Sequence, residues 1–370
     1  MSDDFSPVRF GGPHYAVGFS PWKKPLVRGF LPESQIAFVR NLNSVPCDAS
    51  LMVWGRSQDP QIQRAIESGR LASDPKVIRL EDGFLRSVGL GAGLTRPLSW
   101  VADPLGIYYD ATRPSGLEDL LSTHPFPPPL LQRAAALRER VVALNLTKYN
   151  VGTQGWTRPT NASRVILVPG QVEADASLRF GSPRIRTNLE LLRAVRESHP
   201  SAFLVYKPHP DVASGLRGAG AGESQTPLWS DCVLKDVSMA DVLPEVDEVH
   251  LLTSLTGFEA LLRGKKVVCY GLPFFAGWGL TEDREPTPRR GRSLSLDALV
   301  AATLVLYPRY LSRTTAQMVS PETALDELVA WRELERRRPR SLTSRIAAVC
   351  TRGLVSLFNR IHDQRRSRSI

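Results

Sequence analysis

The segment AFLVYKPHPD, residues 202–211, runs from apolar side chains directly into Lys207 and a histidine held between two prolines. The apolar run predicts a buried strand. Pro208 and Pro210 fix their own φ angles and restrict the preceding residues to extended backbone, so His209 has little backbone freedom. A rigid histidine beside a lysine at the end of a strand suits a phosphate and a nucleotide base or ribose. The alternative is a surface turn, which the two prolines disfavour.

Similar apolar runs alternate with helical patterns along most of the chain. Strands are expected at 37–39, 51–54, 77–80, 165–168, 203–206, 248–252 and 266–270, and helices at 59–68, 130–146, 187–198 and 257–263. Alternating strands and helices predict parallel sheets with covered faces. We therefore predict an α/β fold with two Rossmann-like domains facing across a cleft, where ligands bind beyond the carboxyl ends of the strands.

The predicted domain organisation has four segments. The Rossmann-like domains are expected at 1–155 and 156–300, followed by a helical segment at 301–335 that packs back on them and a basic tail at 336–370. The tail is distinctive because residues 331–370 contain eleven arginines and three acidic residues, which supply +8 of the net charge of +10.

Apolar residues between Ile346 and Ile361 recur at helical spacing, so the tail predicts a basic amphipathic helix. Such a helix suits an anionic membrane surface, and a solvated tail or a partner-binding helix is an equally good interpretation. Nucleic acid is not expected as a partner, because the arginines lack interleaved aromatic residues or a nucleic-acid-binding motif.

The remaining composition excludes several classes of protein. The four cysteines are scattered and the six histidines are few, which argues against a structural zinc site and a disulfide framework. The first ten residues, MSDDFSPVRF, lack the apolar region of a secretory signal, and no run of about 18 apolar residues is present. We expect a cytoplasmic protein without a metal cofactor.

A pair of carboxylates follows an expected strand in the first domain. In LEDGFLRS, residues 80–87, adjacent side chains of Glu81 and Asp82 point in opposite directions unless Gly83 turns the backbone. One carboxylate can then face the cleft while the other bonds to the backbone or to Arg86. Taken alone, the motif is also typical of a solvated turn that caps a helix.

Two further motifs end strands in the second domain. In VPGQVEAD, residues 168–175, Gln171 follows a glycine turn, and Glu173 and Asp175 resemble a DxD metal site. Two carboxylates alone do not fix a divalent ion, so a cap for the next segment is favoured over a metal site. Metal ligands are therefore not predicted.

The motif LTSLTGFEA, residues 252–260, passes from a strand into a helix through Ser254 and Thr256. The hydroxyls and the free backbone N–H groups, including that of Gly257, can bind an anion, and Glu259 could reach ribose hydroxyls. Simple capping of the helix is the alternative. Neither GxxxxGK[ST] nor GxGxxG occurs, which disfavours a P-loop NTPase and a dinucleotide oxidoreductase. Carboxylates in one domain and phosphate-binding strand ends in the other are what a two-domain glycosyltransferase needs.

With these motifs, the chain resembles the capsule polysaccharide synthesis family of bacterial β-Kdo glycosyltransferases. The resemblance rests on VGFSPWKK (17–24), EDGFLRSVGLGAG (81–93), LGIYYDATRPS (105–115), VPGQVEADAS (168–177), VYKPHPDV (205–212) and TSLTGFEALLRGKKVVCYGLPFFAGWGLTED (253–283). It implies a GT-B-like fold, CMP-Kdo as donor, and a Kdo product on a lysophosphatidylglycerol primer. Members typically have two such modules, each making one linkage, and this chain contains one.

The resemblance also implies a mechanism. CMP-Kdo is itself β-linked, so a β-linked product requires retention and two displacements. Asp82 would attack the anomeric carbon, and the acceptor hydroxyl would displace the adduct with help from Glu81 as base. Arg86 and Arg113 are candidates for contact with the sugar carboxylate or the acceptor, on their charge alone.

The predicted donor site comprises Gln171, Lys207, His209, Ser254, Thr256, Gly257 and Glu259. His209 and Lys207 would bind the CMP phosphate, the helix start at 254–257 would hold the same phosphate, and Glu259 would bind the ribose. The expected partners are the CMP-sugar, a glycolipid acceptor and other capsule synthesis or export proteins, at the inner face of the cytoplasmic membrane. Two alternatives remain: a non-catalytic nucleotide-sugar-binding or export-assembly subunit, and a transferase for another CMP-activated acid sugar such as sialic acid.

Overall fold

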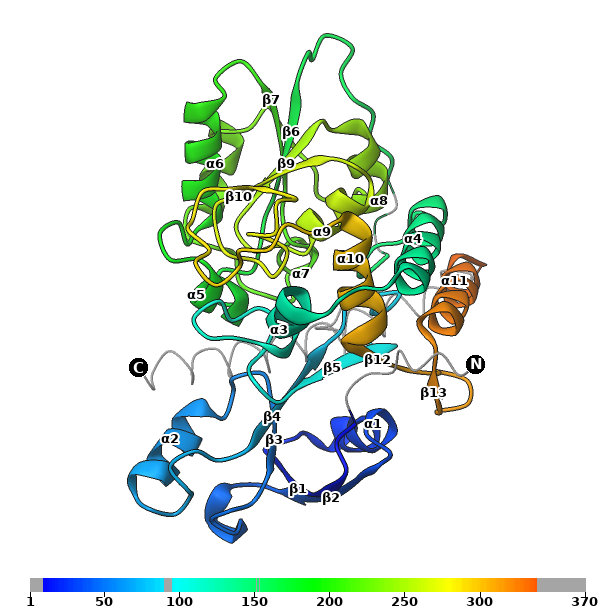
Figure 1. Ribbon diagram of the computed structural model, residues 1–370. Coiled ribbons are helices and arrows are strands. Elements are labelled where there is room, and N and C mark those ends of the chain that lie inside the picture. The colour runs from blue at the N-terminus through cyan, green and yellow to red at the C-terminus, as the bar shows by residue number, and fades with distance from the viewer. Residues whose placement is uncertain (1–8, 90–94, 151, 153, 338–370) are drawn as a thin grey trace, which may run out of the picture. The chain divides into compact units, whose positions relative to one another are not determined.

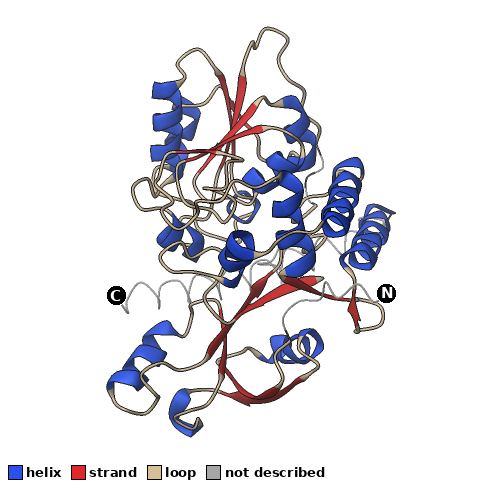
Figure 2. Ribbon diagram, in the orientation of Figure 1, coloured by secondary structure: helices blue, strands red, loops and turns tan. Residues whose placement is uncertain are grey.

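The computed structural model describes residues 9–89, 95–150, 152 and 154–337, which form two compact units (Figure 1). The first unit comprises the described residues within 1–86, 97–138 and 297–327, and the second those within 87–96, 139–296 and 328–370. Each unit has its own β-sheet with helices packed against it (Figure 2). The predicted α/β class is confirmed.

The first unit contains a seven-stranded sheet in the order β13-β12-β5-β4-β3-β1-β2. Its strands are β1 (Gly12–Val17), β2 (Ser34–Val39), β3 (Leu51–Trp54), β4 (Val77–Asp82), β5 (Ser99–Asp103), β12 (Pro308–Leu311) and β13 (Met318–Val319). Neighbouring strands from β2 to β4 are parallel, whereas β5, β12 and β13 pair antiparallel. Strand β4 extends two residues beyond the expected end at residue 80, so Glu81 and Asp82 belong to the sheet.

The described helices of the first unit are α1 (Lys24–Phe30), α2 (Asp59–Glu67), α3 (Gly116–Thr123), most of α4 (Pro128–Ala143), most of α10 (Leu296–Val300) and the start of α11 (Pro321–Arg337). Apolar residues of α1 and α2 share core clusters with strands of the sheet. Helix α1 has Pro25 in its first turn, where a missing N–H is tolerated, and it buries Leu26, Val27 and Phe30 in the core. This burial fixes the chain between β1 and β2.

The segment 301–335 differs from the helical segment that the sequence predicts. It begins with a π-helix (Ala301–Leu306), continues as β12 and β13, and ends in α11. Strand β12 pairs with β5, and all four of its residues are buried, including a proline at its first position. The segment therefore completes the sheet of the first unit instead of lying on its surface.

The second unit contains a six-stranded sheet in the order β11-β10-β9-β6-β7-β8, with every neighbouring pair parallel. Its strands are β6 (Val165–Pro169), β7 (Phe203–Lys207), β8 (Cys232–Val233), β9 (Glu248–Leu251), β10 (Lys266–Cys269) and β11 (Glu282–Asp283). The helices are α5 (Ala176–Gly181), α6 (Asn188–Ser198), α7 (Pro210–Ala213), α8 (Met239–Val242) and α9 (Thr256–Leu262). All residues of β6 and β9 are buried, as expected for strands covered on both faces.

The division of the chain differs from the predicted boundary at residue 155, because residues 139–155 group with the second unit. Hydrogen bonds explain this: Glu259 of α9 accepts from Lys148 N at 2.7 Å, and Arg263 donates to Leu146 O at 3.0 Å. Residues 297–327 join the first unit through β12.

The predicted basic tail lies outside the described residues, except for Arg336 and Arg337 at the end of α11. Within the described ranges, no helix has both the length and the apolar character needed to cross a membrane.

Candidate functional site

The parallel sheet of the second unit brings three strand-end motifs together. Gly170 N, after β6, donates to Lys207 O at the end of β7, at 2.8 Å. The side-chain amide of Gln171 makes two hydrogen bonds with Thr253, which follows β9. Its Oε1 accepts from Thr253 N at 2.9 Å, and its Nε2 donates to Thr253 Oγ1 at 3.0 Å. Its backbone is fixed on both sides by Asn188. Gln171, predicted to bind the donor, therefore connects the ends of β6 and β9.

His209 is held as a neutral hydrogen-bond donor. Its Nδ1 accepts from Asp211 N at 3.2 Å and caps α7, so the proton of the neutral ring lies on Nε2. Burial, together with the positive charges of Lys148, Arg217 and Lys207, lowers the pKa of His209 to about 3. The ring therefore stays neutral at pH 7, and Nε2–H can donate to an anion.

The lysine of the same motif is almost completely buried. Lys207 has only 6% of its surface exposed, and burial lowers its pKa to about 8, an effect that the charge of Asp236 partly opposes. In the portion of the chain that the structure describes, its ammonium has neither a hydrogen bond nor an ion pair. A buried ammonium is expensive to leave uncompensated. Lys207 and the charges around His209 thus form a site that a phosphate would stabilise.

Ser254 and Thr256 lie at the start of α9, as predicted, but bond to each other. Ser254 Oγ donates to Thr256 Oγ1 at 3.1 Å and accepts from Thr256 N at 3.3 Å. Gly257 N donates to Ser254 O at 3.1 Å. This is the local capping that the sequence left as the alternative interpretation, and an anion would have to share these groups.

Gly257 has a packing role. A Cβ built on it would collide with Leu251 Cδ2 and would lie 2.6 Å from Phe275 Cζ, and both neighbouring side chains are completely buried. The missing side chain therefore lets α9 lie directly on the core.

Replacing Gly257 by Ala is expected to destabilise the protein by about 1–3 kcal/mol, because neither buried neighbour can move without repacking. Urea unfolding would measure this change. Gly291→Ala is the matched control, since a Cβ there meets nothing within 4 Å, and it should change stability by less than about 0.5 kcal/mol. Equal stability of the two variants would contradict the assigned packing role.

Glu259, predicted to bind ribose, is buried and already engaged. One carboxylate oxygen accepts from Lys148 N at 2.7 Å, and Arg263 adds a nearby positive charge. Burial raises the pKa of Glu259, and these two partners oppose that effect. The residue thus holds the segment that carries Lys148 beside the anion site.

Glu173 and Asp175 do not form the DxD-like pair considered from the sequence. Glu173 accepts from two backbone amides, Asn188 N at 2.9 Å and Ala221 N at 2.7 Å, and so fixes the loop after Arg217. Asp175 precedes α5 and lies 3.8 Å from Arg217. Within the described residues, no group of three or more His, Cys, Asp or Glu side chains is arranged to hold a metal ion.

In the first unit, the two carboxylates at the end of β4 have different surroundings. Asp82 Oδ2 accepts from Arg86 Nε at 2.6 Å, and Arg86 is 3% exposed. Glu81 Oε1 accepts from Asp82 N at 3.0 Å. A Cβ built on Gly55 would collide with the Tyr109 hydroxyl and lie 3.1 Å from Glu81 Oε2. Arg86, a predicted contact of the sugar carboxylate, is therefore used to orient Asp82.

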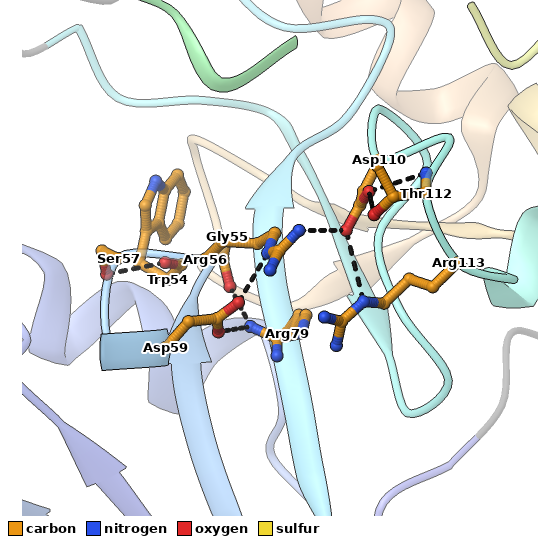
Figure 3. Close-up of polar contacts among 9 residues, drawn as sticks. All are labelled: Trp54, Gly55, Arg56, Ser57, Asp59, Arg79, Asp110, Thr112 and Arg113. Atoms are coloured by element: carbon orange, nitrogen blue, oxygen red, sulfur yellow. Dashed lines mark hydrogen bonds and ion pairs between the residues drawn. The ribbon is translucent and has the colours of Figure 1, made fainter. Parts of the chain in front are cut away.

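Beside this pair, an ion-pair network fixes the loop after β3 (Figure 3). Arg56 Nε lies 2.5 Å from Asp59 Oδ2, and Arg56 Nη1 lies 2.8 Å from Asp110 Oδ2. Arg79 Nη1 donates to Asp59 Oδ1 at 2.6 Å and to Gly55 O at 2.8 Å. The network holds the backbone of Gly55 beside Glu81.

Arg113, the other predicted contact of the sugar carboxylate, lies at the edge of this network (Figure 3). Its Nε is 3.5 Å from Asp110 Oδ2, and 45% of its side chain is exposed. It is therefore more accessible than Arg86.

Several residues that the sequence reasoning did not assign lie at these sites. In the second unit they are Lys148 and Arg217, whose charges act on His209. In the first unit they are Lys23, Trp54 and Tyr109. Lys23 and Tyr109 lie within motifs that resemble those of the family, so the sequence could have indicated them as site residues. No local pattern marks Lys148 or Arg217.

Comparisons with known proteins agree on one family. Residues 50–151 and 131–310 match the family described as capsule polysaccharide biosynthesis protein. The chain is 43% identical over 332 residues to capsule polysaccharide modification protein LipA of Neisseria meningitidis serogroup A, covering 88% of this chain and 46% of LipA. It is 38% identical over 324 residues to lipopolysaccharide-processing protein LpsZ of Rhizobium meliloti, covering 84% and 73% respectively. The chain thus spans about half the length of LipA.

Two solved structures of Thermosulfurimonas dismutans KpsC are also similar. Its β Kdo 2,7 transferase is 43% identical with a TM-score of 0.69, covering 86% of this chain and 99% of that one. Its β Kdo 2,4 transferase is 33% identical with a TM-score of 0.74, covering 85% and 97%. These similarities confirm the GT-B-like α/β fold class. The chain belongs to the capsule polysaccharide biosynthesis protein family.

Proposed function

We propose that this chain is a retaining β-Kdo glycosyltransferase module that transfers Kdo from CMP-Kdo to a glycolipid in capsule biosynthesis. The observation that carries the proposal is the anion site of the second unit, where Lys207 is buried and His209 is a fixed neutral donor. The 43% identity to a β Kdo 2,7 transferase, over nearly the whole of that chain, supports Kdo as the sugar.

In the proposed donor complex, Lys207 and His209 Nε2–H bind the phosphate of CMP. Lys148 and Arg217 add positive charge around the same point. Charge on the phosphate grows as CMP leaves, so these preorganised groups stabilise the transition state more than the bound donor. His209 does not have to move into place, because it is fixed by Asp211 N and by its two prolines.

Transfer then proceeds in two displacements. The Asp82 carboxylate attacks the anomeric carbon, the bond to the phosphate oxygen breaks, and CMP leaves with the electron pair. Arg86 holds Asp82 Oδ2, which leaves Oδ1 to form the ester. An acceptor hydroxyl next attacks the same carbon, gives its proton to Glu81, and releases Asp82 as a carboxylate. Two inversions give net retention.

For the acceptor, we propose a Kdo-terminated glycolipid on a lysophosphatidylglycerol primer and a β-(2→7) linkage. The sequence identity favours the 2,7 enzyme, whereas the TM-score is higher for the 2,4 enzyme. We give identity more weight, since linkage is set by side chains and a TM-score reports the backbone. A glycolipid acceptor would bring the module to the cytoplasmic face of the membrane, where a second module or another capsule protein would add the next sugar.

The proposal is tested by incubating the purified protein with CMP-Kdo and synthetic Kdo-terminated lysophosphatidylglycerol. Mass spectrometry should show one added Kdo, and NMR should show a β-(2→7) linkage. CMP-sialic acid serves as the competing donor and should give at most a trace of product. A 2→4 product would overturn the linkage, and preference for CMP-sialic acid would overturn the donor. CMP-Kdo binding without transfer or hydrolysis would favour the non-catalytic alternative.

A further inference from the structure

The proposed donor is an acid sugar, so its carboxylate needs a partner near Asp82. The sequence suggested Arg86 and Arg113 for this role. Arg86 is 3% exposed and is bonded to Asp82 itself at 2.6 Å. Arg113 is associated with Asp110, at the outer edge of the network that fixes Arg56. Neither arginine therefore presents a well-placed cation to a ligand beside Asp82.

Lys23 supplies a different cation to the same end of the sheet. It follows β1 in a short 3-10 helix (Pro21–Lys23), in which Lys23 N donates to Ser20 O at 3.0 Å. Helix α1 starts at the next residue, and its buried apolar side anchors the backbone. The position of Lys23 is thus determined on both sides by regular structure.

The side chain of Lys23 lies on a tryptophan. Its Nζ is 3.0 Å from the centroid of the Trp54 ring, a cation–π contact. The ring of Trp54 meets Trp100 edge-on at 5.0 Å, and Trp100 lies directly opposite Asp82 in the β4–β5 ladder. Trp54 itself pairs with Leu80 on β4. Lys23 therefore sits on the aromatic surface that adjoins Asp82.

The positive charge of the Lys23 ammonium has no direct ion-pair partner among the described residues. Among the residues that the structure describes, the ammonium of Lys23 makes no hydrogen bond and no ion pair, and it lies over the rings of Trp54 and Trp22, with its Nζ 3.0 Å and 5.6 Å from their centroids. Burial and the charge of Arg86 lower the pKa of Lys23 to about 8, although Glu81 and Asp82 oppose this shift. A ligand carboxylate could accept from the N–H donors of this ammonium, which bond to no oxygen among the described residues.

We propose that Lys23 binds the carboxylate of the donor's acid sugar beside Asp82, and that it thereby selects acid sugars over neutral ones. The inference rests on the proposed function. Trp54 contributes by orienting the ammonium, because the ring face takes part of its three N–H donors and leaves the rest available to a carboxylate. Binding of the carboxylate would place the anomeric carbon, which bears it, within reach of Asp82.

The test compares CMP-Kdo with an analogue whose carboxylate is replaced by a carboxamide. Wild type should prefer the acid by about 10- to 100-fold in kcat/KM, the range expected for charge-assisted hydrogen bonds. Lys23→Met should lose most of this preference, because activity on the acid falls while activity on the amide changes little. Lys24→Met is the matched control: it removes the adjacent lysine, which lies over Phe38 at 5.4 Å, and should keep the preference.

A pH profile gives a second readout. Free Lys23 is charged below its pKa of about 8 and neutral above it, so the wild-type preference for the acid over the amide should fall as pH rises through about 8. The preference is the readout because Lys207, whose pKa is also lowered to about 8, acts on the phosphate of both donors alike. Lys23→Arg keeps its charge throughout, so this fall in preference should move upward by at least about one pH unit. Because Lys23 belongs to the first unit and the CMP site to the second, a thermal unfolding transition and a circular dichroism spectrum like those of wild type would show that each variant is folded.

The outcomes separate the two proposals. If wild type transfers Kdo and Lys23→Met keeps the acid preference, or loses activity equally on acid and amide, the role of Lys23 is overturned and the function stands. If the acid preference falls at the same pH in Lys23→Arg as in wild type, the role is again overturned. If wild type transfers no Kdo from CMP-Kdo, the proposed function itself fails, and the role of Lys23 fails with it.

Discussion

Replacing Asp82 by Asn is expected to reduce Kdo transfer by about 10³-fold or more, the effect of removing a nucleophile. Asn keeps an oxygen that can accept from Arg86 Nε, which in the native protein bonds Asp82 at 2.6 Å. The fold of the β4 end should therefore survive. CMP affinity should not change, because the residues proposed to bind CMP belong to the second unit.

Glu81→Gln provides the matched comparison, because it removes the proposed base and leaves the nucleophile. The first displacement should still occur and the second should be slow. Intact-protein mass spectrometry after mixing with CMP-Kdo should then show one Kdo bound to Glu81→Gln protein and none bound to Asp82→Asn protein. Asp82→Asn activity near that of wild type would exclude Asp82 as the nucleophile, and an adduct mapped to another residue would reassign the role.

Replacing His209 by Asn is expected to weaken CMP binding by about 10- to 100-fold, since one hydrogen bond to a charged phosphate is lost. The side chain of Asn can still accept from Asp211 N, the bond that His209 Nδ1 makes at 3.2 Å and that caps α7. It has no group at the position of Nε2. Calorimetric titration with CMP measures the change, and thermal unfolding reports whether the cap is kept.

His209→Gln should keep the donor to the phosphate and lose the cap of α7. The amide nitrogen of Gln can occupy the position of Nε2, but its side chain no longer accepts from Asp211 N. It should bind CMP more tightly than His209→Asn and unfold at a lower temperature. His209 is neutral at pH 7, with a pKa lowered to about 3 by burial and by three nearby cations, so wild type and His209→Gln should show the same dependence of CMP affinity on pH. The phosphate of CMP itself titrates near about pH 6. A step that wild type shows and His209→Gln lacks would therefore mean that the ring binds as an imidazolium.

Local signals were sufficient for most of the architecture. The apolar runs at 165–168 and 203–206 became β6 and β7, because a strand buried on both faces needs a continuous apolar sequence. The polar residues after these strands were predicted to meet at one edge, and they do, with Gly170 N bonded to Lys207 O. Parallel pairing makes this outcome predictable, since all carboxyl ends lie on the same side of the sheet.

The roles of individual side chains were less predictable. Gln171 and Glu259 are predicted to bind the donor, and the structure adds that Gln171 is bonded to Thr253 and Glu259 to Lys148 N. These partners are separated by 82 and 111 residues along the chain. No local pattern encodes which distant backbone group a polar side chain will meet.

The sequence by itself determined the α/β class, the strand-end motifs and the family, because apolar periodicity and turn chemistry act over a few residues. Only the tertiary structure decided that residues 308–311 complete the sheet of the first unit, that Arg86 bonds to Asp82, and that Lys23 lies over Trp54. It also gathered Lys148 and Arg217 around His209. These features depend on side chains that packing brings together from distant parts of the chain. Burial then determines which charged groups are paired within the protein and which can bind a ligand.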